Sequence, residues 1–254
     1  MTRRVSDNQG VRIIIAGGDE AGRGAVFGPL TVSVVSISKG KEAKLSRIGV
    51  RDSKLLTRRK REFLVDEIHS IAEDVKVYKI GNDEINRAMQ GGMSLNELEA
   101  LNFAKLIDSL KEYPSKIYLD SPDVVSERFG IRVSLFSNLS MRVFGTKVKA
   151  KTPTPEINQK RITLIAEHKA DLRYPVVSCA SIMAKVERDD EIDRIKEKLG
   201  IDIGSGYPSD MKTVDALRTY LKDKTVTPYI RERWKTIDII RQLKISDFLE
   251  NGDQ

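Results

Sequence analysis

The chain has almost no cysteine or histidine and no long apolar run, and each shortage argues against a class of protein. Among 254 residues the only cysteine is Cys179, so no intramolecular disulfide can form, and a structural zinc site is disfavoured. Histidine occurs only as His69 and His168, so metal chemistry must rest mainly on carboxylates. No apolar run approaches the roughly 20 residues of a membrane span. Residues 1–10 are polar, unlike a secretory signal, and we therefore expect a cytoplasmic protein.

Positive charge is in excess and is concentrated in two places. The formal net charge is +7 and 32% of the residues are charged, which is compatible with a globular protein that binds a polyanion. One cluster lies at 54–61 and the other at 147–151. Each cluster could equally be a solvated helix face or loop, so the charge alone does not establish nucleic-acid binding.

The hydrophobic pattern predicts an α/β protein with a mixed five-stranded sheet, flanking helices and a C-terminal helical region. Strands are expected at about 12–17, 30–37, 75–80, 116–119 and 161–166. A helix should begin after Thr57, and two more should flank Gly91 and Gly92. Further helices are expected at about 176–199, 209–222 and 235–249, with Gly200 suited to end the first.

Acidic residues follow three of the predicted strands. Asp19 and Glu20 come after the first, Asp120 closes the fourth, and Asp171 follows the fifth. Carboxylates at strand ends can meet in space although they are distant in sequence, and grouped carboxylates suit hard divalent cations. Two such cations are a common apparatus for breaking phosphodiesters. Solvated acids at strand ends are the alternative for any one of these residues alone.

Seven segments, in the same order along the chain, resemble the type 2 ribonucleases H (ribonuclease HII), and especially their archaeal and eukaryotic branch. The matching segments are 18–24 (Gly-Asp-Glu-Ala-Gly-Arg-Gly), 52–56, 118–120, 168–171, 174–189, 204–210 and 231–234. The resemblance implies a ribonuclease H-like fold and hydrolysis of RNA in RNA/DNA hybrids. It also implies incision 5′ to single ribonucleotides in duplex DNA, with two Mg²⁺ or Mn²⁺ ions and 5′-phosphate and 3′-hydroxyl products.

The same resemblance implies a role for each matching residue. The catalytic and metal-binding acids would be Asp19, Glu20, Asp120 and Asp171, with Asp19 bridging the two ions. The substrate-binding residues would be Gly22, Arg23, Gly24, Lys54, Asn96, Lys185, Arg188 and Tyr207. The glycines free the backbone to approach the 2′-hydroxyl, which is what separates RNA from DNA, although a plain hairpin turn would have the same composition.

One spacing departs from the family pattern. Asp171 lies 51 residues after Asp120, which is longer than the family leads us to expect, so we predict an insertion at about 132–160. If the register there is misread, the fourth carboxylate could be Glu167 or Asp123. We expect a catalytic domain over 1–200, a C-terminal region over 201–254 that contributes to substrate binding, and a monomer.

The end of the chain resembles a sliding-clamp-binding peptide. Its anchors would be Gln242, Ile245, Phe248 and Leu249, spaced as in peptides that dock in a groove of the clamp. The alternative is the apolar stripe of a terminal helix, in which Ile239 and Leu243 would pack on the body of the protein.

Three other functions remain open from the sequence. Another nuclease or polynucleotidyl transferase with the ribonuclease H fold would not need the Gly-Arg-Gly loop and Tyr207 as sensors of a 2′-hydroxyl. A nucleotide-binding protein would need a Gly-x-x-x-x-Gly-Lys segment at this loop, which is lacking. The third is a catalytically silent nucleic-acid-binding module. The intact carboxylates argue against it, but only an activity assay can exclude it.

Overall fold

The computed structural model describes residues 12–50, 56–145 and 162–242, and these form a mixed sheet of six strands. The strands are β1 (Ile14–Ala21), β2 (Leu30–Ser38), β3 (Asp74–Ile80), β4 (Lys116–Asp120), β5 (Met141–Val143) and β6 (Ile162–Glu167). Their order across the sheet is β3-β2-β1-β4-β6-β5. β1, β2 and β3 are antiparallel neighbours, whereas β4 runs parallel to β1 and β6, and β5 runs parallel to β6.

The α/β class is confirmed, but the prediction of five strands is wrong by one. The missed strand is β5, and its three residues are too few to show an alternating pattern. β1 and β2 form an antiparallel hairpin, with Asp19 opposite Ser33.

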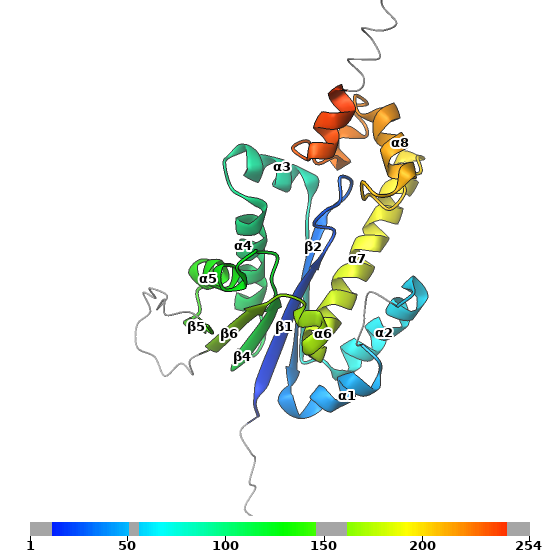
Figure 1. Ribbon diagram of the computed structural model, residues 1–254. Helices are drawn as coiled ribbons and strands as arrows, with labels where there is room; N and C mark the ends of the chain where they lie inside the picture. The colour runs from blue at the N-terminus through cyan, green and yellow to red at the C-terminus, as the bar shows by residue number, and fades with distance from the viewer. Residues whose placement is uncertain (1–11, 51–55, 146–161, 243–254) are drawn as a thin grey trace, which may run out of the picture.

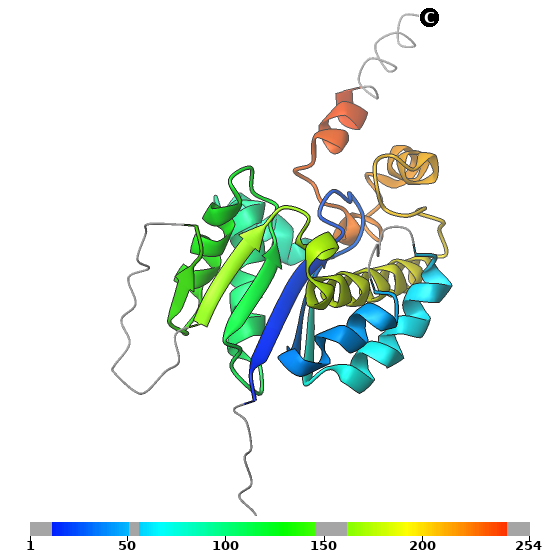
Figure 2. The same ribbon diagram turned by 60° about the horizontal axis from the view of Figure 1, so that its bottom comes forward.

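Helices cover both faces of the sheet (Figures 1 and 2). They are α1 (Glu42–Arg47), α2 (Arg58–Ile71), α3 (Asn82–Gln90), α4 (Leu95–Asp108), α5 (Ser126–Phe136), α6 (Ala170–Arg173), α7 (Pro175–Leu199) and α8 (Met211–Tyr220). Short 3₁₀ helices occupy Lys39–Lys41 and Thr227–Tyr229, and 235–242 is helical at the end of the described chain. The predicted helices over 57–71, on both sides of Gly91 and Gly92, and over 176–199 are confirmed. None of the described helices has the length and apolarity of a membrane span.

Local sequence explains where these helices begin and end. The Thr57 hydroxyl accepts a hydrogen bond from the Lys60 amide at the start of α2. Ser94 and Glu97 form a capping box at the start of α4. Gly200 ends α7 with a φ of 66°, in the left-handed region that glycine enters at little cost.

The sheet separates two apolar cores because side chains of a strand alternate between its faces. Ala16 faces the core formed with α4 and α5, and its neighbour Ile15 faces the core formed with α7, α2 and α1. On the first face, the rings of Phe103 and Phe129 join α4 to α5 edge to face, with centroids 5.8 Å apart. Both cores therefore fix β1, the strand that carries the first two acids.

The start of α7 lies directly on β1. A Cβ at Gly17 would lie 2.5 Å from the backbone carbon of Val176, which no side chain could accept. Glycine at this position therefore lets the helix approach the strand two residues before Asp19. Ala180 and Ser181, one turn further on, are also buried against the sheet.

A third apolar cluster joins the C-terminal region to the rest of the molecule. It contains Val26 and Phe27 from the β1–β2 connection, Ile192 from α7, and Leu217 and Ile237 from beyond α7. In Figure 1 this region lies at the top, above the end of α7 and beside the β1–β2 turn. The C-terminal region is therefore in contact with the connection that follows Asp19 and Glu20. A domain boundary at residue 200 stays a prediction.

Candidate active site

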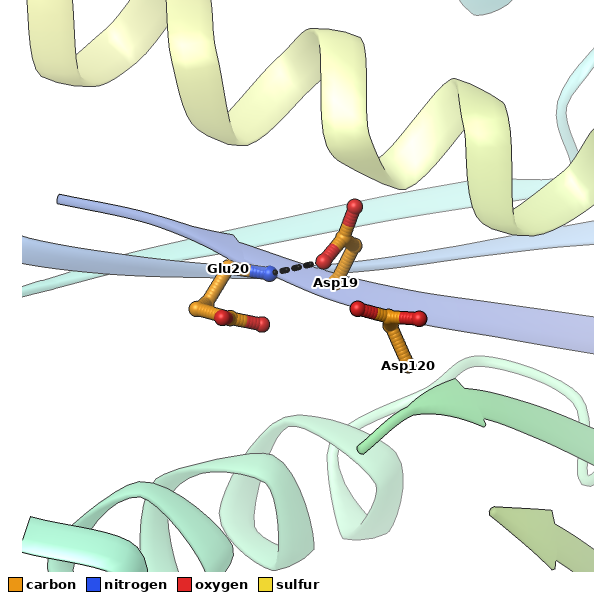
Figure 3. Close-up of side chains that lie close together, drawn as sticks. All are labelled: Asp19, Glu20 and Asp120. Atoms are coloured by element: carbon orange, nitrogen blue, oxygen red, sulfur yellow. Dashed lines mark hydrogen bonds between the residues drawn. The ribbon is translucent and has the colours of Figure 1, made fainter. Parts of the chain in front are cut away.

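Three of the predicted acids meet at one edge of the sheet. β1 and β4 run parallel with Gly18 opposite Leu119, so the next residues, Asp19 and Asp120, are neighbours. Carboxylate oxygens of Asp19, Glu20 and Asp120 lie within 4.8 Å of one another, and the three side chains face a common space (Figure 3). Three carboxylates in such a group form an oxygen donor set that suits divalent cations.

Asp19 and Glu20 both reach this space although they are consecutive. Side chains alternate on a regular strand, but these two residues stand next to the end of β1, where the chain turns. The Glu20 amide donates a 2.8 Å hydrogen bond to Asp19 Oδ1, which orients that carboxylate. Figure 3 shows the bond as a dashed line, with Glu20 and Asp19 on either side of the strand.

The acids are held where their negative charge is costly. Burial, followed by the nearby Glu20 and Asp120 carboxylates, raises the pKa of Asp19 well above its usual range, and a hydrogen bond from Ser181 opposes the rise. Burial and the charge of Glu99 raise the pKa of Glu20 to about 8. Glu20 Oε2 is buried and makes no hydrogen bond to any described residue. A cation would relieve both the repulsion and the missing contact, so the residues present fit a metal site.

Asp171 lies near this group but outside it. It is buried on α6, and the three acids whose oxygens lie within 4.8 Å of one another do not include it. Asp120 Oδ1 accepts a 2.7 Å hydrogen bond from the Ala170 amide, so the start of α6 is tied to the acid at the end of β4. The role of Asp171 stays a prediction.

The two alternatives for the fourth carboxylate have other partners. Glu167 accepts hydrogen bonds from Arg173 and Tyr174. Asp123 accepts hydrogen bonds from Asn96 and Arg132. Neither belongs to the group of three acids, and Asp171 does not either, so the identity of the fourth carboxylate stays a prediction.

The Gly-Arg-Gly turn follows the acids directly, and its arginine is anchored on α4. Gly22 has a φ of 91°, where glycine is favoured. The Arg23 guanidinium donates to Glu99 and to Asn96, two residues of α4. The side chain of Arg23 therefore braces the loop against the helix. Contact of the Gly22 and Gly24 backbone with a substrate stays a prediction.

Glu99 is a residue of this site that sequence reasoning missed. Its side chain is fully buried, and burial raises its pKa to about 7 against the opposing charge of Arg23. It lies three residues after Asn96, on the same face of α4. The available signal was an acid at a position in the apolar stripe of a predicted helix, where an unpaired charge is costly.

Three predicted substrate-binding residues lie on α7 or against it. Lys185 Nζ donates a 2.9 Å hydrogen bond to Ser181, which in turn hydrogen-bonds Asp19. The Arg188 guanidinium lies 4.3 Å from the centroid of the Tyr207 ring and donates a 2.5 Å hydrogen bond to the Ser205 carbonyl. Arg188 therefore holds both the ring of Tyr207 and the turn that precedes it.

Two arginines of the basic cluster at 54–61 are paired with acids of α7. Arg58 forms ion pairs with Asp190 and Asp193, and Arg61 forms one with Asp189. The predicted phosphate contact Lys54 and the second basic cluster at 147–151 lie outside the described residues. Structural ion pairing therefore accounts for part of the charge that the sequence suggested was free for nucleic acid.

The C-terminal anchors fall mostly outside the described residues. Gln242 is the last residue described, and Ile245, Phe248 and Leu249 lie beyond it. Ile239 is 55% exposed, which argues against the alternative in which it packs on the body of the protein.

Comparisons with known proteins agree with this geometry. A family model described as Ribonuclease HII matches residues 16–237. The ribonuclease HII of Pyrococcus furiosus is 42% identical over 229 residues, which cover 90% of this chain and 91% of that protein. The ribonuclease HII of Archaeoglobus fulgidus is 39% identical over 233 residues, which cover 92% of this chain and 99% of that protein.

Solved structures give the same result. The crystal structure of ribonuclease H2 from Pyrococcus horikoshii has a TM-score of 0.74 and 38% identity, covering 91% of this chain and 98% of that one. A chain in the structure of the PCNA:RNase HII complex from Archaeoglobus fulgidus has a TM-score of 0.71 and 37% identity, covering 88% and 96%. The Mn²⁺ complex of Bst-RNase HIII is similar in fold alone, with a TM-score of 0.69 and 19% identity, covering 91% and 70%.

Proposed function

The chain belongs to the ribonuclease HII family and is thus a metal-dependent hydrolase, and we propose that it cuts RNA in RNA/DNA hybrids and incises duplex DNA 5′ to a single embedded ribonucleotide. The observation that carries the proposal is a group of three crowded carboxylates, two of which come directly before a Gly-Arg-Gly turn. The first feature suits phosphodiester hydrolysis, and the second suits close contact with a ribose.

The carboxylates of Asp19, Glu20 and Asp120 would hold two divalent cations, Mg²⁺ or Mn²⁺, with Asp171 as a fourth acid. Bound there, the cations supply activation of the attacking water and stabilisation of the leaving 3′-oxygen. The protein contributes the orientation of the donors. The Glu20 amide fixes Asp19, and the Ala170 amide fixes Asp120.

Recognition of the ribonucleotide would come from the backbone around Gly22 and Gly24 and from Tyr207. A 2′-hydroxyl can both donate and accept a hydrogen bond, so a sensor needs polar groups held at a fixed place. Arg23 braces the turn on α4, and Arg188 holds the ring of Tyr207 at 4.3 Å. Both supports restrict motion of the groups that would contact the sugar.

Phosphate contacts would come from basic and polar residues around this centre. The proposed residues are Lys54, Asn96, Lys185 and Arg188. Contacts of this kind position a duplex without reading its sequence, and they make binding sensitive to salt. We assign the acids to a catalytic part over 1–200, and we assign completion of the substrate surface to the region over 201–254, which contains Tyr207.

A sliding clamp is the proposed protein partner. A similar chain was solved in a PCNA:RNase HII complex, and Gln242, Ile245, Phe248 and Leu249 have the spacing of a clamp-binding peptide. A pull-down with purified clamp should retain the wild-type protein and lose the Phe248→Ala variant, while Asp247→Ala serves as the matched control. Equal retention of Phe248→Ala and wild type would remove this assignment.

Cleavage of an end-labelled DNA duplex with one ribonucleotide tests the enzymatic proposal. Reactions with Mg²⁺, Mn²⁺ or chelator should be compared for the wild type and Asp120→Asn. Asp215→Asn is the control, because Asp215 lies on α8 outside the group of three acids and its side chain is 65% exposed. We expect a metal-dependent cut 5′ to the ribonucleotide that is lost in Asp120→Asn and on all-DNA duplex.

The other outcomes separate the alternatives. A cut on a long RNA/DNA hybrid without a cut at the single ribonucleotide would refute the proposed role of Tyr207 in recognising a ribonucleotide within DNA. No cut on either substrate would favour a silent nucleic-acid-binding module.

A further inference from the structure

Arg231 is the largest fully buried side chain of the described protein, and it carries a charge. It follows the 3₁₀ helix Thr227–Tyr229 and lies next to Ile230, which pairs with Phe27 in an isolated β-bridge. No carboxylate forms an ion pair with it anywhere in the described ranges. Its role is therefore not the usual one of neutralising a buried acid.

The Arg231 guanidinium instead crosslinks the β1–β2 loop through two backbone carbonyls. Nε and one terminal nitrogen donate to the Gly28 carbonyl at 3.1 and 2.9 Å. The other terminal nitrogen donates to the Arg23 carbonyl at 3.0 Å. Arg23 stands in the Gly-Arg-Gly turn, and Gly28 stands just before β2, so one planar group holds both ends of the loop.

The segment that carries Arg231 is itself firmly held. Its amide donates to the Val26 carbonyl at 2.9 Å. Asn86 of α3 donates to the Ile230 carbonyl at 3.0 Å and accepts from the Glu232 amide at 3.1 Å. The guanidinium also lies 5.0 Å from the centroid of the Trp234 ring. The crosslink is therefore fixed to α3 and to the C-terminal region.

This arrangement has an electrostatic cost. Burial, together with the nearby positive charge of Arg188, lowers the pKa of Arg231 to about 9. An apolar side chain of similar volume would fill the same place without desolvating a charge. What such a side chain could not do is donate three hydrogen bonds to the loop, so the hydrogen bonds are the property that distinguishes arginine here.

We propose that Arg231 is a positioning residue, which holds the Gly22–Gly24 backbone in the conformation that receives the ribose and its phosphate without itself touching the substrate. The proposal rests on the proposed function for the identity of the substrate. A residue of the C-terminal region would then fix the conformation of the loop, although it lies more than 200 residues from the loop in sequence.

Two variants of Arg231 and one matched control test this inference. Arg231→Met removes the charge and all three hydrogen bonds, whereas Arg231→Lys keeps the charge and loses the planar geometry. Ile237→Ala is the control. Ile237 is fully buried in the apolar cluster that joins the C-terminal region to the rest of the molecule, and it has no hydrogen bond to the loop. All proteins should be assayed at a temperature where circular dichroism shows them to be folded.

Two readouts separate positioning from general stability. Hydrogen exchange of the amides at 22–24 should be at least tenfold faster in Arg231→Met than in wild type, with Arg231→Lys intermediate. KM for the single-ribonucleotide duplex should rise at least tenfold in Arg231→Met. Ile237→Ala should have a lower Tm but wild-type exchange at 22–24 and wild-type KM.

The inference is overturned if Arg231→Met matches Ile237→Ala in both readouts. If the wild-type enzyme does not cut the duplex, the proposed function fails, and hydrogen exchange alone still decides whether Arg231 holds the loop.

Discussion

Raising the pH should destabilise the metal-free protein, and Glu20 should account for a measurable part of the loss. The folded state raises the pKa of Glu20 from an ordinary 4.5 to about 8. The folded protein therefore keeps a proton that the unfolded chain has released, so the contribution of Glu20 to stability is fully present below about pH 4.5 and is lost as the pH rises through about 8. One pKa unit corresponds to about 1.4 kcal/mol, and about 2.6 of these units are expressed between pH 5 and pH 8, which gives about 3.5 kcal/mol. Glu20 is half-buried, and screening by water reduces the expected effect to about 2 kcal/mol.

Urea unfolding in chelator at pH 5, 6, 7 and 8 measures this effect when wild type is compared with Glu20→Gln. The variant has no proton to lose at this position, and it also removes one of the charges that raise the pKa of Asp19. Its free energy of unfolding should therefore fall less steeply with pH than that of wild type. Saturating Mg²⁺ should stabilise the wild type more at pH 8 than at pH 5, because cations bind the deprotonated acids. Parallel pH profiles for the two metal-free proteins would refute the reasoning.

Three further predictions concern the supports of the site. Gly22→Ala places a methyl group 2.7 Å from the Pro29 carbonyl at a φ of 91°, so thermal unfolding should show a loss of about 2 kcal/mol. Glu99→Gln removes the negative charge that pairs with Arg23 and one cause of the raised Glu20 pKa, so kcat/KM should fall about tenfold and the pH dependence of stability should become shallower. Ser94→Ala removes the capping box of α4 and should cost about 1 kcal/mol in urea unfolding with unchanged KM.

The regular elements could be predicted where the local pattern is long enough to be read. The alternating residues of β2 and β3 identified those strands, and Thr57 and Gly200 marked helix ends that the structure has at those positions. The short elements α1 and β5 carry too few residues for a period to show. α5 was missed because it contains Gly130, a poor helix former that is present because Val143 packs 3.0 Å from where its Cβ would lie.

The acids of the site could be predicted because strand ends meet at a sheet edge. That rule placed Asp19 and Asp120 together without knowledge of the strand order, and the parallel register of β1 and β4 made them neighbours. It could not resolve Asp171, which stands on a short helix after the strand, in a position set by the turn at Lys169 with a φ of 57°.

The supporting residues could not be predicted because they act through tertiary contacts. Glu99 and Arg231 meet the loop from segments 76 and 208 residues away from Arg23. Nothing in the local sequence of Arg231 distinguishes it from a solvated charge. The place of Glu99 in the apolar stripe of α4 indicates a buried acid, but it does not reveal that Arg23 is the partner. The pairing of Arg58 with Asp193 was hidden for the same reason, since it depends on how α2 packs against α7.

The central claim is that Asp19, Glu20 and Asp120 form the metal centre of a ribonuclease H. Anomalous scattering from Mn²⁺-soaked crystals of the wild type and of Asp120→Asn tests it most directly. We expect manganese peaks among these three carboxylates in the wild type, and weakened or absent peaks in the variant. Manganese bound elsewhere in the wild type, or unchanged peaks in Asp120→Asn, would show that these acids are not the metal centre.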